Sequence, residues 1–150
     1  ALPEDHVSLV TYANADSGGA ALNQALVEAA ARSPRIIARE SLGQLLYLSA
    51  LRHASMVVGN SSSGLYEAPS FGIPTINIGT RQDGRLKASS VIDCVPERDA
   101  ISNAIGRGLG MDCRKTVSPY GDGDATDRIL RILRGVAPFR QIGSKVFFDS

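Results

Sequence analysis

The chain has 150 residues, of which 43% are hydrophobic, and a formal net charge of +1. This length and composition fit one compact domain with its own core, and the balanced charge gives no reason to expect nucleic acid or a membrane surface as a partner. No apolar run approaches the roughly 18 residues of a membrane-spanning helix.

The start of the chain lacks both the basic region and the apolar stretch of a signal peptide. It also lacks an initiator Met, which points to a processed chain or to a fragment of a longer protein. The two cysteines, Cys94 and Cys113, are expected to be reduced thiols rather than a disulfide or a metal site. We therefore expect a cytoplasmic protein without a bound metal.

Predicted strands and helices alternate along the chain. Apolar runs rich in β-formers predict strands at 7–12, 35–39, 55–59, 75–79 and 91–95. Apolar spacing and breakers predict helices at 20–32, 41–54, about 62–67, from Pro96 to near 106–110, and from Asp124 to about 134. This order predicts an α/β fold: a Rossmann-like parallel sheet with helices on both faces.

Two of these helices carry more specific expectations. Ser41 and Gln44 have the spacing of a capping box at the start of the second helix. In the last helix, Ile129, Ile132 and Leu133 are spaced to face inward together.

Three polar turns follow predicted strands, at 14–19, 60–64 and 80–90. In parallel α/β sheets, ligands bind at the carboxyl ends of the strands, so these turns are the places to look for a site. The turn at 60–64 contains Ser61, Ser62 and Ser63, whose hydroxyls and backbone N–H groups suit an anion such as phosphate. It is not a P-loop, and an ordinary serine-rich helix cap is the alternative.

Three charged residues follow this turn. Glu67 suits the paired hydroxyls of a ribose, but its position alone favours an acid that stabilises a helix start. Arg81 and Arg85 suit diphosphate oxygens, and solvated loop charge is the alternative for both. His6 and His53 are isolated, and no Ser-His-Asp or paired-acid spacing is evident.

The stretch 57–94 resembles the signature of the hydrolysing UDP-N-acetylglucosamine 2-epimerases. The resemblance is concentrated at 59–64, 67–79 and 81–85, with further matches at 11–18 and 119–124. It implies a two-domain fold of the GT-B kind, with a UDP-sugar in the cleft between two Rossmann-like domains. Residues 1–150 then form the second, UDP-binding domain, and the tail of about 135–150 packs on the first.

The resemblance also implies roles for individual residues. Ser61 and Ser62 would bind the diphosphate, Glu67 the ribose hydroxyls and Arg81 the nucleotide or phosphate region, while Asn14 would face the UDP-sugar. Weaker candidates at the same site are Ser41, near the uracil, together with Ser63, Gly64 and Arg85. No cofactor is implied.

The implied reaction removes the proton at C2 of the sugar and expels UDP from C1, and water then adds to the glycal to release N-acetylmannosamine for sialic-acid-like sugars. The family's acid/base residues belong chiefly to the first domain and have no counterpart here, so His6 is not equated with the catalytic His. The implied partners are the UDP-sugar and the N-terminal domain of the same enzyme, with a homodimer left open.

Two other interpretations remain open from the residues alone. One is the nucleotide-binding domain of a GT-B glycosyltransferase, which would share the fold and the serine turn. The other is a flavodoxin-like regulator, for which Asp16 is the one candidate phosphoacceptor. The sequence also leaves open whether the sugar is N-acetylglucosamine or a diacetamido sugar.

Overall fold

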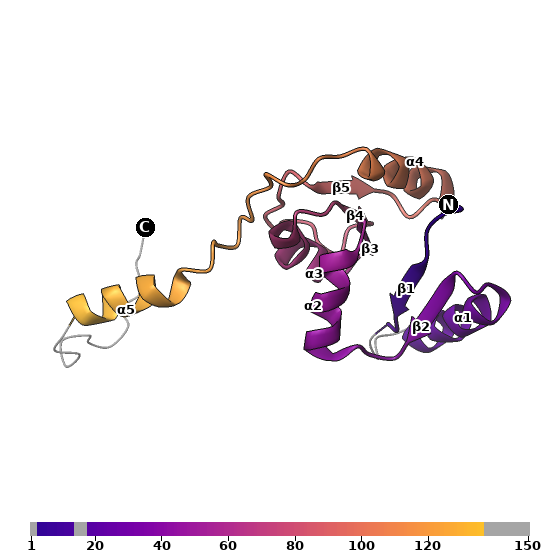
Figure 1. The fold of residues 1–150 in the computed structure, drawn as a ribbon, viewed down its shortest axis with the longest axis horizontal. Helices are drawn as coiled ribbons and strands as arrows, with labels where there is room; N and C mark the ends of the chain where they lie inside the picture. Colours follow the sequence, from indigo (N-terminus) through magenta and orange to yellow (C-terminus); the bar gives the residue numbers. More distant parts are fainter. Residues whose placement is uncertain (1–2, 14–17, 137–150) are drawn as a thin grey trace, which may run out of the picture.

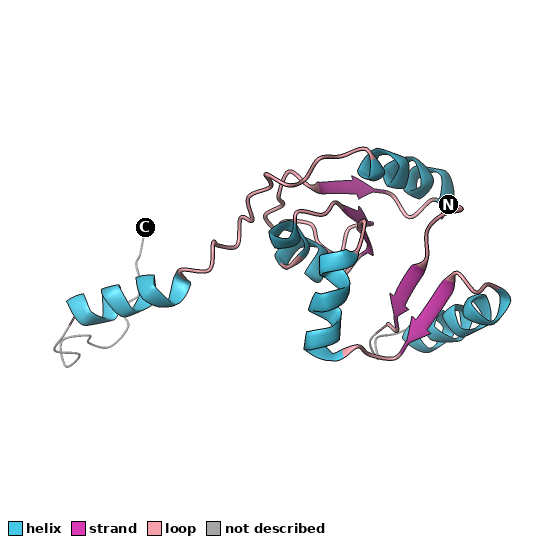
Figure 2. Ribbon diagram, in the orientation of Figure 1, coloured by secondary structure: helices cyan, strands magenta, loops and turns pink. Residues whose placement is uncertain are grey.

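The computed structural model of the chain describes residues 3–13 and 18–136. Its strands and helices follow the predicted alternation (Figures 1 and 2). In chain order they are β1 (Ser8–Thr11), α1 (Gly19–Arg32), β2 (Ile36–Arg39), α2 (Gly43–His53), β3 (Val57–Gly59), α3 (Ser63–Tyr66), the 3-10 turn η1 (Ala68–Phe71), β4 (Thr75–Ile78), β5 (Val91–Cys94), α4 (Arg98–Leu109) and α5 (Ala125–Gly135).

All strand pairs in the described part of the chain are parallel. β1 pairs with β2, and β4 lies between β3 and β5 in a second, three-stranded sheet. Figure 1 shows α1 beside the first pair and α4 beside the second sheet. The predicted α/β class with parallel strands is therefore confirmed, with the strands hydrogen-bonded in two groups.

Helices cover both faces of the three-stranded sheet. Ile76 of β4 and Ile92 of β5 form the apolar core with Ala104 and Ile105 of α4. Successive residues of a strand point to opposite faces, so Thr75 faces the other side, where α3 packs against β3 and β4. Burial of these aliphatic side chains is what holds α4 on the sheet.

The beginning of α2 differs from the sequence expectation, because the predicted capping box does not form. The helix begins at Gly43, and the Ser41 hydroxyl accepts a 3.2 Å hydrogen bond from the Gly43 N–H instead of capping a residue three positions on. Gly43 has a φ of +64°, a left-handed conformation that turns the chain immediately before the helix. Ser41 consequently lies in the loop before α2.

The prediction that α5 turns its apolar side chains inward is wrong for the described chain. Ile129, Ile132 and Leu133 are 56%, 65% and 41% exposed, and α5 has no buried residue. Figure 1 shows α5 set apart from the other elements at the end of an extended segment. The apolar spacing correctly predicted a helix, but no element among the described residues buries the apolar face of α5.

α3 approaches β4 closely at Gly64. A Cβ atom at Gly64 would lie 2.5 Å from Cγ2 of Thr75, which is shorter than real side-chain contacts. The Thr75 hydroxyl donates a 2.8 Å hydrogen bond to the Gly64 carbonyl, and both residues are buried. The absent side chain therefore lets α3, and the turn that precedes it, lie directly on the sheet.

We predict that Gly64→Ala lowers the free energy of unfolding by about 1–3 kcal/mol, because the added methyl group overpacks this contact. Combining it with Thr75→Ser should recover part of the loss, since Ser lacks Cγ2 and keeps the hydroxyl. Chemical denaturation measures both effects.

Gly106→Ala is the matched control. Nothing lies within 4 Å of a Cβ at Gly106, which is within α4, so Ala there should leave stability unchanged or raise it by about 0.5–1 kcal/mol. Equal stability of the two alanine variants would contradict the close approach at Gly64.

Candidate functional site

The serine turn, defined as residues 60–63, connects β3 to α3. Ser62 is the N-cap residue of α3, yet its hydroxyl makes no capping hydrogen bond. The Ser61 hydroxyl oxygen accepts only a long, 3.4 Å bond from the Ser63 N–H, so its O–H group is left to donate. Two hydroxyl donors thus lie directly after a strand, although α3 has only 4 residues and contributes a correspondingly small dipole.

Gly64 and Ser63 have structural partners. Gly64 is buried against Thr75, as described above, and the Ser63 hydroxyl is hydrogen-bonded to the hydroxyl of Tyr47 on α2. Both residues therefore shape the turn, while the Ser62 hydroxyl makes no capping bond and the Ser61 hydroxyl accepts only the long bond from Ser63.

Glu67 lies between α3 and η1, and its N–H donates a 2.9 Å hydrogen bond to the Ser63 carbonyl. Its side chain is partly buried, and the Oε2 atom is covered and has no hydrogen-bond partner within the described part of the chain. Leaving a buried acceptor unpaired is unfavourable by about 1–3 kcal/mol. Hydroxyl donors from a ligand would relieve that penalty.

The loop between β4 and β5, residues 79–90, is joined to the serine turn by Gln82. Arg81 is exposed, whereas Gln82 is only 2% exposed. The Nε2 group of Gln82 donates a 2.7 Å hydrogen bond to the carbonyl of Asn60, the residue before Ser61. This bond connects the segment that carries Arg81 to the start of the serine turn.

Arg85 lies over the aromatic ring of Tyr66, which is not on its own loop. Its guanidinium carbon lies 5.5 Å from the ring centroid of Tyr66, at the end of α3. The Tyr66 ring meets the Tyr120 ring edge-on at 4.2 Å, and the Tyr120 hydroxyl donates a 2.9 Å hydrogen bond to the Leu86 carbonyl. This arrangement favours a loop-stabilising role for Arg85 over direct contact with a ligand.

The end of the loop is held by Lys87 and Asp93. Lys87 Nζ lies 2.9 Å from both carboxylate oxygens of Asp93 on β5, and Asn77 of β4 donates a 2.7 Å bond to one of them. Burial opposes ionisation of Asp93, but the hydrogen bonds from Lys87 and Asn77 and the Lys87 charge outweigh it, so the pKa of Asp93 is lowered.

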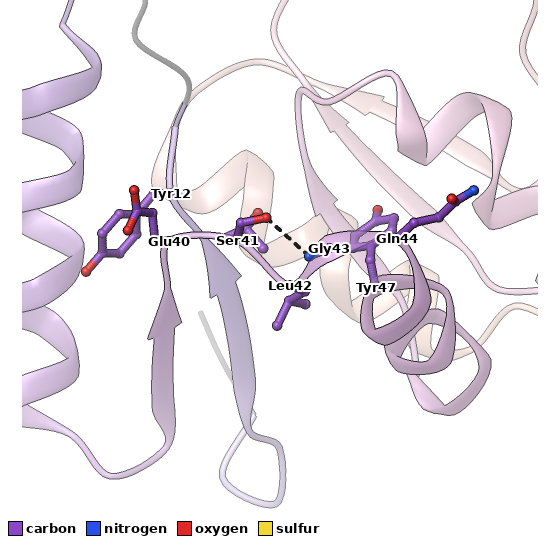
Figure 3. A pocket seen from close by; sticks show the side chains of 8 residues that line it. Tyr12, Glu40, Ser41, Leu42, Gly43, Gln44 and Tyr47 are labelled. Carbon is purple, nitrogen blue, oxygen red and sulfur yellow. Dashed lines mark hydrogen bonds between the residues drawn. The ribbon is translucent and has the colours of Figure 1, made fainter.

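A pocket of about 310 Å³ opens where β1 and β2 end and α2 begins (Figure 3). Its lining residues are Thr11, Tyr12, Glu40, Ser41, Leu42, Gly43, Gln44 and Tyr47. Figure 3 shows Tyr12 and Glu40 at one end and Gln44 and Tyr47 at the other. Because Tyr47 is also bonded to Ser63, the pocket adjoins the serine turn.

Asn14, expected to face the ligand from the first turn, lies outside the described residues, as does Asp16. Ala13, the residue before Asn14, is held in place by Asn23 of α1. The Asn23 side chain accepts a 2.8 Å hydrogen bond from the Ala13 N–H and donates a 3.2 Å bond to the Ala13 carbonyl. The role of Asn14 therefore stays a prediction.

Sequence analysis missed three residues that organise this edge, namely Asn23, Tyr47 and Gln82. Each is hydrogen-bonded to a residue at least ten positions away, Asn23 through two bonds and the others through one. A polar side chain in a helix or a loop carries no sequence signal for such a partner. Within the described residues, no cluster of His, Cys, Asp or Glu could hold a metal ion, and no helix is long and apolar enough to cross a bilayer.

Comparison with solved structures defines the class of this domain. Two structures of the UDP-GlcNAc 2-epimerase from Methanocaldococcus jannaschii match with TM-scores of 0.71 and 0.67, at 19% and 18% identity. They cover 88% and 87% of this chain but only 37% and 36% of their own, and the second is a complex with UDP-GlcNAc and UDP. The chain is thus an α/β domain of the GT-B-like fold.

The sequence comparisons identify the family. The model of the UDP-N-acetylglucosamine 2-epimerase family matches residues 1–134, so the chain belongs to that family. It is 31% identical over 141 residues to UDP-N-acetylglucosamine 2-epimerase from Neisseria meningitidis serogroup B, covering 92% of this chain and 37% of that protein. It is 30% identical over 132 residues to the hydrolyzing UDP-N,N'-diacetylbacillosamine 2-epimerase from Legionella pneumophila, covering 88% and 35%.

The chain therefore spans little more than a third of the length of the curated relatives it matches. This coverage agrees with the predicted correspondence to one domain of a longer enzyme. The family match favours an epimerase domain over the glycosyltransferase and flavodoxin-like alternatives.

We predict that the Lys87–Asp93 pair contributes a pH-dependent part of the stability. Because the pKa of Asp93 is lower in the folded chain than in the unfolded chain, this contribution is complete above the unfolded value of about 4 and is lost as the pH falls through the folded value. Asp93→Asn should lower the unfolding free energy by less than about 1 kcal/mol near neutral pH, since the side chain is 54% exposed.

Urea denaturation of wild type and Asp93→Asn between about pH 7 and pH 3 measures this difference, which should shrink toward the acid end. Lys87→Gln should show a similar loss, and the double variant should lose no more than the larger single loss. A difference that is constant with pH would contradict the assignment.

Proposed function

We propose that this chain is the C-terminal, UDP-binding domain of a hydrolysing UDP-N-acetylglucosamine 2-epimerase that acts in the cytoplasm. The substrate would be UDP-N-acetylglucosamine or a related UDP-diacetamido sugar, and the products UDP and N-acetylmannosamine or the matching 2-epimer. Support comes from the family match, the hydrolyzing relative in Legionella pneumophila and the UDP-GlcNAc complex of the Methanocaldococcus jannaschii protein.

The observation that carries this proposal is the covered, unpartnered Oε2 atom of Glu67 beside the serine turn. A carboxylate accepts hydrogen bonds from two vicinal hydroxyls, and these are what a ribose offers. A solvated acid at a helix start would have no need of a covered oxygen. Glu67 is therefore our candidate for holding the ribose.

The other parts of a UDP molecule fit on either side of Glu67. We place the diphosphate at the hydroxyls of Ser61 and Ser62, with Arg81 on the adjacent loop supplying positive charge. We place the uracil in the pocket that contains Ser41, which adjoins the serine turn through Tyr47 and Ser63. A planar base suits a pocket whose walls include Tyr12 and Tyr47.

This domain of the enzyme would act on the leaving group. Removal of the C2 proton and departure of UDP from C1 give a glycal, and water then adds to it. Negative charge grows on the diphosphate as the C1–O bond breaks. Hydroxyl donors and a guanidinium already in place for that charge stabilise the transition state without having to reorganise.

We predict saturable binding of UDP by the folded chain, measured by isothermal titration calorimetry. Glu67→Ala should weaken binding by about 10- to 100-fold, because two hydrogen bonds to a charged acceptor are lost. Arg81→Ala should weaken it by about tenfold through loss of one charge-assisted contact.

Matched controls are Glu28→Ala on α1 and Arg107→Ala on α4, which remove the same charges from exposed positions outside the pocket lining and the serine turn. They should bind UDP as the wild type does. A second arm repeats the titration on a fusion of this chain to the N-terminal part of the Neisseria meningitidis relative. Absence of UDP binding by both folded proteins would falsify the nucleotide-site assignment.

We further predict that this chain alone does not turn over UDP-N-acetylglucosamine, because we place the acid/base residues of the reaction in the other domain. Coupled detection of released UDP should show no rate above background, whereas the fusion should show activity. Full turnover by the 150 residues would overturn the division of roles.

A further inference from the structure

Gln82 is the one buried side chain in an otherwise exposed stretch of the loop after β4. Arg81, Asp83, Gly84 and Arg85 are all exposed, while Gln82 is 2% exposed. Burying an amide is unfavourable unless its groups are hydrogen-bonded, so a polar residue held inside at this place needs a structural cause. The cause is its bond to the serine turn.

The bond runs from Gln82 Nε2 to the carbonyl oxygen of Asn60, over 2.7 Å. Because a carbonyl oxygen only accepts, the donor must be the amide nitrogen, and the orientation of the Gln82 amide follows. Asn60 directly precedes Ser61, and Gln82 directly follows Arg81. One hydrogen bond therefore joins the two segments that carry the proposed diphosphate contacts.

The other contacts of the loop hold different parts of it. Lys87 pairs with Asp93 of β5, and Tyr120 donates a hydrogen bond to the Leu86 carbonyl. Arg85 reaches α3 through Tyr66, at the far end of that helix. Gln82 alone among these side chains is bonded to the serine turn itself.

We infer that Gln82 is a positioning residue for UDP: its hydrogen bond to Asn60 holds Arg81 and the hydroxyls of Ser61 and Ser62 at the spacing that lets them bind one diphosphate together. This role rests on the proposed function, because it belongs to the same UDP site. Gln82 touches the backbone of the turn, and its effect on the ligand passes through that turn.

The Gln82→Glu variant makes the hydrogen bond to Asn60 depend on the protonation state of the introduced carboxyl group. An ionised carboxylate cannot donate to the Asn60 carbonyl, whereas a protonated carboxyl can. Burial raises the pKa of a carboxyl group, which brings the titration of this group toward the pH range used for binding measurements. The neighbouring residues Arg81 and Asp83 place one charge of each sign beside it. UDP affinity, relative to wild type at the same pH, should be about tenfold weaker at pH 8 and recover toward wild type at about pH 5.5.

Gln82→Met is the second variant, because it has a similar volume and no donor. It should weaken UDP binding by about tenfold at both pH values. It should also speed amide hydrogen exchange of the segment 60–66, measured without ligand. The control is Gln24→Glu, the same chemical change on an exposed position of α1, which should leave UDP binding unchanged at both pH values.

Recovery of affinity by Gln82→Glu at low pH, together with faster exchange at 60–66 in Gln82→Met, supports the positioning role. Wild-type UDP affinity in both folded Gln82 variants overturns it and leaves the proposed function standing. If the wild-type chain and the fusion both fail to bind UDP, the proposed function fails and the role of Gln82 fails with it. Weakened binding by Gln82→Glu that is the same at both pH values rejects the hydrogen bond as its cause.

Discussion

The parallel register of β3, β4 and β5 is the constraint on which the candidate site depends. Gly59, the last residue of β3, is paired with Asn77 of β4, so both strands deliver their following loops to the same edge. Gly59 and Asn77 are eighteen residues apart in sequence. The serine turn and the loop at 79–90, which follow these two strands, nevertheless begin side by side. An antiparallel arrangement of the same strands would send the two loops to opposite edges.

Close packing then fixes the turn on that edge. Gly64 allows α3 to lie against Thr75, and the hydroxyl of Thr75 closes the contact with a hydrogen bond. The turn cannot shift along the sheet without breaking this contact. The rigid parts of the site are thus the sheet and α3, while the ligand-facing groups stand on the loops between them.

Buried polar residues are concentrated in one segment of the chain. The buried polar residues of the described chain are Thr75, Asn77, Gln82 and Ser90, all from β4 or the loop that follows it. Covered oxygens without a partner occur on Glu67, Asn77, Gln82 and Ser90. Thr75 and Ser90 lie at the amino ends of β4 and β5, the edge opposite to the serine turn. Since native proteins pair nearly all buried polar atoms, the unpartnered Oε2 atom of Glu67 beside the serine turn fits a place shaped for a ligand rather than for stability alone.

The sequence by itself determined the order and type of the elements, because apolar spacing and Gly or Pro breakers act locally. It also identified the turn with Ser61 and Ser62, Glu67 and Arg81 as the residues to examine, through motif resemblance. Local pattern was insufficient at Ser41, where the left-handed Gly43 moved the helix start, and at α5, where spacing gives a helix but not its partner. Only the tertiary structure decided that Gln82 is buried against Asn60 and that Tyr47 bonds to Ser63. Such long-range hydrogen bonds depend on strand register, and strand register is set by the packing of the whole sheet.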